Sequence, residues 1–258
     1  MDTFELGLAG KIAVVTGASE GLGRATAERL ARYGVKLAIC ARRLPVLEAA
    51  AATLRQRTGA DVLAQPCDVT QPAQIEAFVA AVVARWGGVD ILVNNAGTSA
   101  AAPFGDVSDA QWQADWDLKL MAAVRFYRAI IPLMQRRGGG RIVNVTTIGG
   151  KAPMARALPT TVTRAAGINL TKSLATEYAT DKILVNTICL GVAKSAQLER
   201  RTGPEGEAFR QALLRRIPLG RFGEAEEFAD LVAFLCSTRA NYITGTAINF
   251  DGGMSATV

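Results

Sequence analysis

The chain has 258 residues, of which 50% are hydrophobic and 20% charged, with a formal net charge of +6. That balance is typical of a folded globular protein and excludes disordered and collagen-like chains. The Lys and Arg residues are dispersed and only 6% of the residues are aromatic, so the basic charge does not indicate a nucleic-acid partner.

Neither a membrane segment nor a metal site is expected. The longest apolar runs, such as Ile12–Val15 and Ile91–Val93, are far shorter than the roughly 20 residues that a membrane-spanning helix needs. Residues 1–10 lack the basic head and apolar block of a secretory signal, which predicts a cytoplasmic location. The four cysteines are widely scattered, which favours mostly buried thiols over a zinc site or a disulfide framework.

Short apolar runs alternate with helix-compatible stretches along the whole chain. The runs are almost continuously hydrophobic, which is typical of strands that are buried on both faces. Strands that alternate with helices form a parallel sheet through right-handed crossovers. The sequence therefore predicts a single α/β domain over residues 1–258, with a doubly wound, Rossmann-like, seven-stranded parallel sheet. The predicted strands are Lys11–Val15, Lys36–Cys40, Val62–Gln65, Val89–Val93, Arg141–Val145, Ile183–Ile188 and Thr246–Phe250.

A glycine-rich turn joins the first predicted strand to the helix that follows it. Backbone amides in such a turn and the helix N-terminus can bind the pyrophosphate of a dinucleotide. The spacing Gly-x-x-x-Gly-x-Gly departs from the usual fingerprint, and the alternative is a tight connection without a ligand. The strand before the turn and the helix after it favour the dinucleotide site. Its candidate residues are Gly17, Ser19, Glu20, Gly21, Leu22 and Gly23.

With this turn, the chain resembles the short-chain dehydrogenase/reductase family over nearly its whole length. The further matching stretches are Cys67-Asp68-Val69, Asn94-Asn95-Ala96-Gly97, Arg141-Ile142-Val143-Asn144-Val145, Pro218-Leu219-Gly220-Arg221-Phe222-Gly223, Ile243-Thr244-Gly245 and Asp251-Gly252-Gly253. The resemblance implies that Asp68 and Val69 border the adenine of a nicotinamide dinucleotide. It also implies that the cofactor is lined by Asn95, Ala96, Gly97, Gly191 and Ser195.

The residues after the second predicted strand bear on which dinucleotide is bound. An acidic residue there would bind the ribose hydroxyls of NAD, but this chain has Arg42 and Arg43. A guanidinium can make charge-assisted contacts to the 2′-phosphate of NADP, so NADP(H) is preferred and NAD(H) is the alternative. Glu20 argues for NAD(H), since relatives that favour NADP(H) often carry a basic residue there. Arg42 can also be read as an ordinary solvated arginine.

The positions that carry the family's proton chemistry are altered. In place of the family's serine, tyrosine, lysine and asparagine, this chain has Thr147, Thr160, Arg164 and Lys119, respectively. An alcohol is far less acidic than a phenol, whose pKa is about 10, so Thr160 cannot replace the tyrosine as an acid or base near neutral pH. Arg164 can hold ribose hydroxyls and supply positive charge, but it stays protonated.

Lysine is the remaining candidate proton donor, because the chain has no histidine and a lysine pKa falls with desolvation or a nearby cation. Lys151 and Lys194 are expected to be solvated at the surface. For Lys119 two interpretations stay open. The side chain either works in the active site, as its position suggests, or snorkels to solvent.

The sequence favours an NADP(H)-dependent oxidoreductase that transfers hydride to or from a small carbonyl, imine or conjugated substrate, with atypical proton donation. The alternative is a cofactor-binding pseudoenzyme that senses redox state or stabilises a partner protein. Residues 192–216 are expected to form a substrate lid with a hinge at Gly203-Pro204. The resemblance implies a homotetramer or homodimer that pairs through helices at Ser108–Arg137 and Pro159–Ala179.

Overall fold

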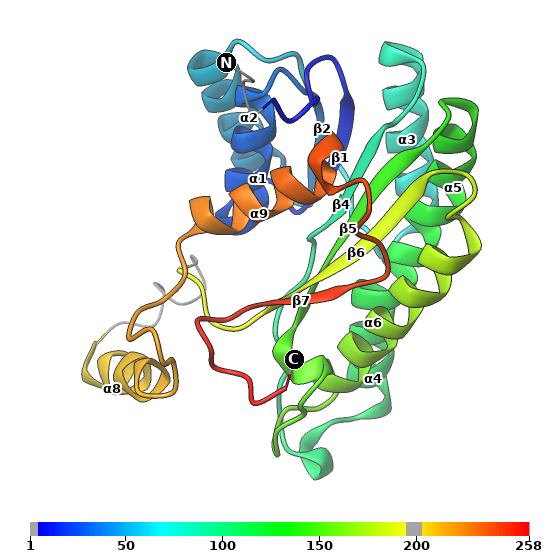
Figure 1. The fold of residues 1–258 in the computed structure, drawn as a ribbon. Helices are drawn as coiled ribbons and strands as arrows, with labels where there is room; N and C mark the ends of the chain where they lie inside the picture. The colour runs from blue at the N-terminus through cyan, green and yellow to red at the C-terminus, as the bar shows by residue number, and fades with distance from the viewer. Residues whose placement is uncertain (1–4, 195–202, 258) are drawn as a thin grey trace.

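The computed structural model describes residues 5–194 and 203–257, which form one α/β unit around a seven-stranded parallel sheet (Figure 1). The strand order is β3-β2-β1-β4-β5-β6-β7, so the chain starts near the middle, winds to one edge and then crosses to the other half. This confirms the predicted Rossmann-like fold. The strands are β1 (Ile12–Thr16), β2 (Lys36–Ala41), β3 (Val62–Pro66), β4 (Ile91–Asn94), β5 (Gly140–Thr147), β6 (Ile183–Leu190) and β7 (Ala247–Phe250).

Helices cover both faces of this sheet (Figure 1). One face carries α1 (Gly21–Arg32), α2 (Leu44–Thr58) and α9 (Ala225–Cys236). The other face carries α3 (Pro72–Trp86), α5 (Ala122–Arg136) and α6 (Thr160–Glu177), with α4 (Asp109–Trp116) leading into α5. Helix α8 (Gly203–Leu214) stands apart from both layers. Single 3₁₀ turns lie at Phe104–Asp106, Ile148–Gly150 and Thr238–Ala240.

Neighbouring residues on the central strands face opposite helix layers. Val15 of β1 packs in one core with Phe228 of α9, whereas Val14 packs in the other core with Phe78 of α3. All four side chains are fully buried. Burying such a side chain contributes roughly 1.5–3 kcal/mol, which explains why almost every strand position is apolar. Because all strands are parallel, the loops after β1, β2, β4, β5 and β6 meet at the same edge of the sheet.

The stretch expected as one long helix, Ser108–Arg137, is interrupted. Ser108 caps α4 by accepting a 3.3 Å hydrogen bond from the backbone N–H of Gln111. A π-helical turn, η2 (Asp117–Met121), then separates α4 from α5. Such a turn adds one residue to the helical repeat and is frequent at functional sites. In this protein it carries Lys119, which is 7% exposed.

Within the described ranges, no helix is long and apolar enough to cross a membrane. All four cysteines are free and buried, as the sequence predicts. The same part of the chain contains no group of three or more His, Cys, Asp or Glu that could hold a metal ion.

Candidate active site

The glycine-rich turn between β1 and α1 is hydrogen-bonded to the loop after β4. Asn95 Nδ2 donates to the carbonyl oxygens of Thr16 and Gly17, at 2.9 and 3.2 Å. The Thr16 hydroxyl in turn accepts the backbone N–H groups of Asn95 and Ala96, at 3.0 and 2.9 Å. These contacts join the two loops where the strand order reverses, which is where α/β sheets of this kind bind dinucleotides.

The shape of the turn fits a dinucleotide. A Cβ at Gly23 would lie 2.4 Å from the Gly17 carbonyl oxygen, and Gly17 itself has a φ of +64°. Both positions therefore require glycine, which brings backbone to the surface of the turn. Glu20 is the N-cap of α1 but its side chain makes no cap hydrogen bond. The N-terminus of α1 is thus left open to a pyrophosphate, beside the half-buried Ser19 and Leu22.

Beyond β2, the two arginines differ in their contacts. Arg43 Nη2 forms an ion pair with Glu20 Oε2 across the turn. Arg42 is exposed, and its side chain makes no hydrogen bond or ion pair with any other residue in 5–194 and 203–257. Arg42 is therefore the arginine that can meet a phosphate without breaking an existing contact.

The other predicted cofactor residues lie at the same edge of the sheet or just behind it. Asp68 follows β3 and accepts the backbone N–H and hydroxyl of Thr70, at 2.9 and 2.8 Å. Val69 is 5% exposed and belongs to the core. Gly97 lies against the catalytic candidates, since a Cβ there would be 2.6 Å from Arg164 Nη2.

The loop after β6 is only partly described. Gly191 packs against Asp251, whose Cβ would lie 2.6 Å from a Cβ at position 191. Ser195 lies outside the described residues, as does the part of the expected lid at 195–202. Gly203 is the first residue of helix α8, so the expected hinge at Gly203-Pro204 lies at a helix end and stays a prediction. Proline near a helix start is favoured, since the first turn needs no N–H donor there.

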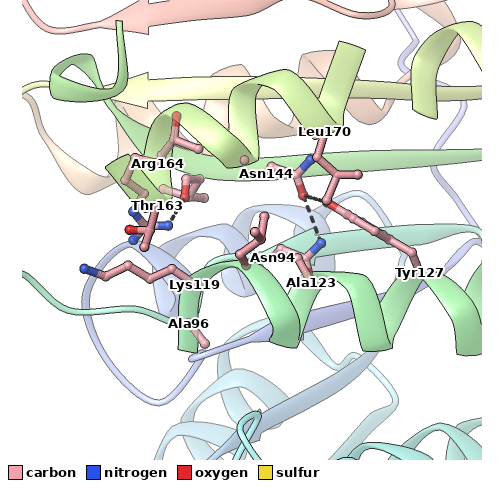
Figure 2. Close-up of a pocket in the computed structure, with 13 residues that line it drawn as sticks. Asn94, Ala96, Lys119, Ala123, Tyr127, Asn144, Thr163, Arg164 and Leu170 are labelled. Carbon is pink, nitrogen blue, oxygen red and sulfur yellow. Dashed lines mark hydrogen bonds between the residues drawn. The ribbon is translucent and has the colours of Figure 1, made fainter. Parts of the chain in front are cut away.

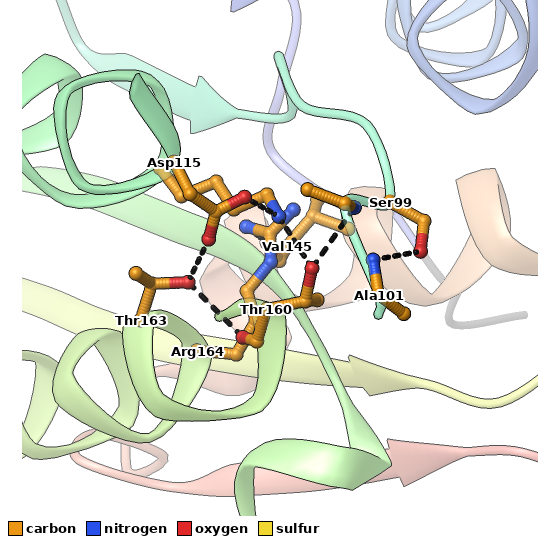
Figure 3. Close-up of polar contacts among 9 residues, drawn as sticks. Ser99, Ala101, Asp115, Val145, Thr160, Thr163 and Arg164 are labelled. Carbon is orange, nitrogen blue, oxygen red and sulfur yellow. Dashed lines mark hydrogen bonds and ion pairs between the residues drawn. The ribbon is translucent and has the colours of Figure 1, made fainter. Parts of the chain in front are cut away.

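Lys119, Thr160 and Asp115 form a buried hydrogen-bonded cluster. Figure 3 shows Asp115, Thr160 and Thr163 around it. Lys119 Nζ donates to Thr160 Oγ1 at 2.9 Å and forms an ion pair with Asp115. The other carboxylate oxygen of Asp115 accepts the Thr163 hydroxyl at 2.6 Å. The Lys119 and Asp115 side chains are only 0% and 2% exposed. The snorkelling interpretation of Lys119 is therefore wrong, because the π turn directs this side chain into the protein.

The electrostatics of the cluster make Lys119 a stronger acid than a free lysine. Burial lowers the pKa of Lys119, the hydrogen bond to Asp115 opposes this, and the positive charge of Arg164 lowers it further. Burial also lowers the pKa of Arg164 to about 10, against the attraction of Asp115. Arg164 thus remains a cation at neutral pH.

The Thr160 hydroxyl is arranged to donate its own proton. Its oxygen accepts hydrogen bonds from Lys119 Nζ and from the backbone N–H of Ala100, the latter at 3.0 Å. A hydroxyl has two acceptor lone pairs and one donor hydrogen, so both lone pairs are in use. The loop that carries Ala100 is held by two backbone hydrogen bonds between Ala102 and Leu158, at 2.9 and 3.1 Å. The hydroxyl hydrogen is left for an acceptor outside these contacts.

A small polar cavity lies behind this cluster (Figure 2). It has a volume of about 20 Å³, enough for about one water molecule. Arg164 lines it, donates from Nη1 to the Val145 carbonyl at 2.8 Å, and has a buried Nε without a partner among the described residues. Tyr127 also lines it, but it donates to Asn144 at 2.6 Å and burial raises its pKa. Tyr127 is therefore a weaker acid than a free tyrosine.

The remaining candidates, Thr147, Lys151 and Lys194, make no hydrogen bond to this cluster among the described residues. Thr147 ends β5, and its hydroxyl has no hydrogen-bond partner within the described ranges. Lys151 is not solvated at the surface as expected, because it is half-buried and donates to the Ala247 carbonyl and to Asn249 Oδ1. These acceptors tie it to β7. Lys194 agrees with the surface interpretation, since its side chain is 55% exposed and pairs with Glu224.

Sequence reasoning missed Asp115. The available signal was its spacing from Lys119, because residues i and i+4 on a helix lie on the same face and oppositely charged pairs stabilise each other. Charge pairs of this spacing are common on exposed helix faces. Only the packing of α4 against α6, which buries Asp115 and brings Thr163 to it, distinguishes this pair from a surface one.

The fold, the glycine-rich turn and the loop positions define an α/β protein of the dinucleotide-binding type. A family model described as enoyl-(acyl carrier protein) reductase matches residues 17–255. The dehydrogenase/reductase SDR family member 4 of Homo sapiens is 36% identical over 250 residues, which cover 95% of this chain and 88% of the relative. The chain belongs to the short-chain dehydrogenase/reductase family.

Solved structures give the same result. L-sorbose reductase from Gluconobacter frateurii, in complex with NADPH and L-sorbose, superimposes with a TM-score of 0.94 and 37% identity, covering 99% of this chain and 100% of that one. An NADPH-bound short-chain oxidoreductase from Pseudomonas aeruginosa PAO1, described as containing an atypical catalytic center, gives a TM-score of 0.91 and 37% identity. That comparison covers 96% of this chain and 98% of that one.

Proposed function

We propose that the protein is an NADP(H)-dependent oxidoreductase that acts on a small carbonyl, imine or conjugated substrate and takes its proton from Lys119. The observation that carries the proposal is the 2.9 Å hydrogen bond from the buried Lys119 Nζ to Thr160 Oγ1. Burial lowers the pKa of Lys119, so its ammonium group can give a proton to the Thr160 oxygen. The Thr160 hydroxyl hydrogen is left for a substrate. Arg164 and Gly97, which are expected to contact the cofactor, lie next to each other beside this cluster.

The cofactor assignment rests on the residues that would hold it. The α1 N-terminus and its glycine-rich turn suit the pyrophosphate, Arg42 suits a 2′-phosphate, and Arg164 suits the nicotinamide ribose. The two solved relatives named above both have NADPH bound, which supports the same choice here. When bound, the nicotinamide supplies or accepts the hydride.

The proton follows a two-step path through side chains of this chain. In reduction, Thr160 donates its hydroxyl hydrogen to the substrate oxygen or nitrogen, and Thr160 Oγ1 takes a replacement proton from Lys119 Nζ. The substrate gains one proton and Lys119 loses one. Because the hydroxyl passes one proton on as it receives another, no free alkoxide is needed, and the high pKa of an alcohol is no obstacle. Asp115 then stabilises the protonated lysine when the proton is restored.

The decisive experiment measures hydride transfer by the nicotinamide absorbance with NADPH and a panel of ketones, imines and enones. The wild type should turn over at least one substrate class, and Lys119→Met should reduce kcat by at least about 100-fold, the typical worth of a positioned acid. The dissociation constant for NADPH should stay nearly unchanged. Tight cofactor binding without turnover by the wild type would instead support the pseudoenzyme alternative.

The cofactor preference is tested separately. Arg42→Ala should weaken NADPH binding by at least about tenfold and leave NADH binding nearly unchanged, because a lost charge-assisted hydrogen bond is worth about 1.5–3 kcal/mol. Isothermal titration of both cofactors measures this. Arg57→Ala is the matched control, since Arg57 lies at the far end of α2 and pairs with Glu28. Equal binding of NADH and NADPH by the wild type would contradict the assignment.

A further inference from the structure

The Thr160 hydroxyl can meet a substrate as a hydrogen-bond donor but not as an acceptor. Its oxygen already accepts hydrogen bonds from Lys119 Nζ at 2.9 Å and from the backbone N–H of Ala100 at 3.0 Å. These two bonds fill both lone pairs of the hydroxyl. The substrate atom that meets Thr160 must therefore offer a lone pair. A carbonyl oxygen does so, whereas the nitrogen of an iminium ion has no lone pair to offer.

The positive charges around this hydroxyl also oppose a cationic substrate. Arg164 lines the same cavity as Lys119 and lies close enough for its charge to lower the pKa of Lys119 (Figure 2). A substrate atom hydrogen-bonded to Thr160 would lie within about 6 Å of Lys119 Nζ, the reach of two hydrogen bonds in series. At that distance two like charges repel far more strongly in a buried site than in water.

The carboxylate of the cluster does not compensate a cationic substrate. One oxygen of Asp115 forms the ion pair with Lys119, and the other accepts the Thr163 hydroxyl at 2.6 Å. The Asp115 side chain is only 2% exposed. Both oxygens are thus engaged by side chains of the protein, and a substrate cation would have to displace one of them to gain a partner.

We propose that Lys119 is a specificity-determining residue that, together with the donor-only hydroxyl of Thr160, excludes iminium ions and selects neutral carbonyl groups, including those of enones. The inference rests on the proposed function and removes from it the imines that react in their protonated form. In ketone reduction, hydride adds to the carbonyl carbon and the Thr160 proton to the oxygen, which gives a neutral alcohol. An iminium carbon needs hydride alone to become an amine, so it gains nothing from the proton path and meets only the repulsion.

The test compares NADPH oxidation by the full-length protein with two substrates, the best ketone or enone of the panel and the permanently charged N-methyl dihydroisoquinolinium ion. In the wild type, kcat/KM for the iminium ion should be at least about 100-fold below that for the carbonyl. Lys119→Met should raise the iminium value at least about tenfold, because it removes the nearest like charge, and lower the carbonyl value at least about 100-fold. Loss of folded protein cannot produce changes in opposite directions.

Two further variants complete the test. Lys119→Met leaves Asp115 buried without its partner, so the double variant Lys119→Met with Asp115→Asn is measured beside it and should show the same two changes. Lys172→Met is the matched control, because it removes a lysine from an exposed position on α6 and should leave the ratio of the two kcat/KM values unchanged.

The outcomes separate this inference from the proposed function. A wild type that reduced the iminium ion as fast as the carbonyl would overturn the inference, as would the absence of an iminium gain in both Lys119 variants. A wild type that bound NADPH but reduced neither substrate would instead contradict the proposed function, and the inference would fail with it.

Discussion

Lys119 can be buried as a cation because its neighbours replace the water that it loses. Transfer of an ammonium group out of water costs several kcal/mol unless it is paired and hydrogen-bonded. Asp115 and Thr160 accept two of its three N–H donors. Removing one partner of such a buried pair typically costs about 3–5 kcal/mol. Asp115 is therefore as much a part of the site as the lysine.

The pH dependence of reduction should report on this pair. Reduction needs protonated Lys119, so the rate should fall as pH rises through the pKa of Lys119. Asp115 favours the charged lysine. In Asp115→Asn that pKa drops further, and the fall in kcat/KM should begin at a lower pH than in the wild type. Asp117→Asn removes a partly exposed carboxylate nearby and should leave the profile in place. A profile that did not move in Asp115→Asn would contradict the role of Lys119 as acid.

Thr160 should be needed for its hydroxyl and for little else. Thr160→Val removes the group that passes the proton on while nearly preserving the side-chain volume, so kcat should fall about 100-fold or more. Thr160→Ser should keep most of the activity. Steady-state kinetics on the best substrate, with NADPH titration to confirm cofactor binding, measures both. An active Thr160→Val variant would mean that Lys119 or water reaches the substrate without the hydroxyl.

At the scale of the elements, the sheet could be predicted from sequence and the contacts of the site could not. Burial on both faces leaves continuous apolar runs, and these mark every strand. The π turn at Asp117–Met121 inserts a single residue into a helical stretch, which barely changes the apolar repeat. Lys119, Thr160 and Arg164 were found by register with a family. The hydrogen bond between Lys119 and Thr160 depends on the π turn packing against α6, and that of Arg164 on its contact with Val145 of β5, and no local pattern reveals either.

Alanine substitutions at Gly23 and Gly21, in and next to the turn before α1, should differ in how strongly they weaken NADPH binding and stability. In Gly23→Ala the new Cβ would lie 2.4 Å from the Gly17 carbonyl oxygen, and that backbone cannot move without reshaping the turn. NADPH binding should weaken at least about tenfold and the melting temperature should drop. Gly21→Ala meets nothing within 4 Å and bears only the strain of a φ of +55°, so its loss should be smaller. Titration and thermal melts of both variants make the comparison. Equal effects would show that crowding at Gly23 is not the cause.

For the whole molecule, the exposed side of α6 predicts association with further copies. Only a minority of the 18 residues of α6 are buried, and Val162 is 43% exposed. Trp116 at the end of α4 is 36% exposed. Exposed apolar side chains on neighbouring helices favour a partner surface, so we expect a homodimer or homotetramer.

Light scattering measures this association directly. Val162→Glu should shift the protein toward smaller species, because it places a charge on the expected contact. Leu44→Glu should not, since Leu44 is similarly exposed, at 41%, on the opposite helix layer. A wild type that stayed at the monomer mass of 27.2 kDa at micromolar concentration would contradict the expectation.

The reversal of strand order between β1 and β4 also separates the residues at the nucleotide end of the site from the residues of the proposed proton path. The arginines expected to select the nucleotide, Arg42 and Arg43, follow β2, whereas Asp115, Lys119 and Thr160 lie beyond β4. The Asn95 side chain joins the two regions by donating to the carbonyl oxygens of Thr16 and Gly17, so the junction involves neither the arginines after β2 nor the Lys119 cluster. A lineage can thus exchange its proton donor while inheriting its nucleotide preference intact. The two traits can vary as separate modules within one uninterrupted sheet.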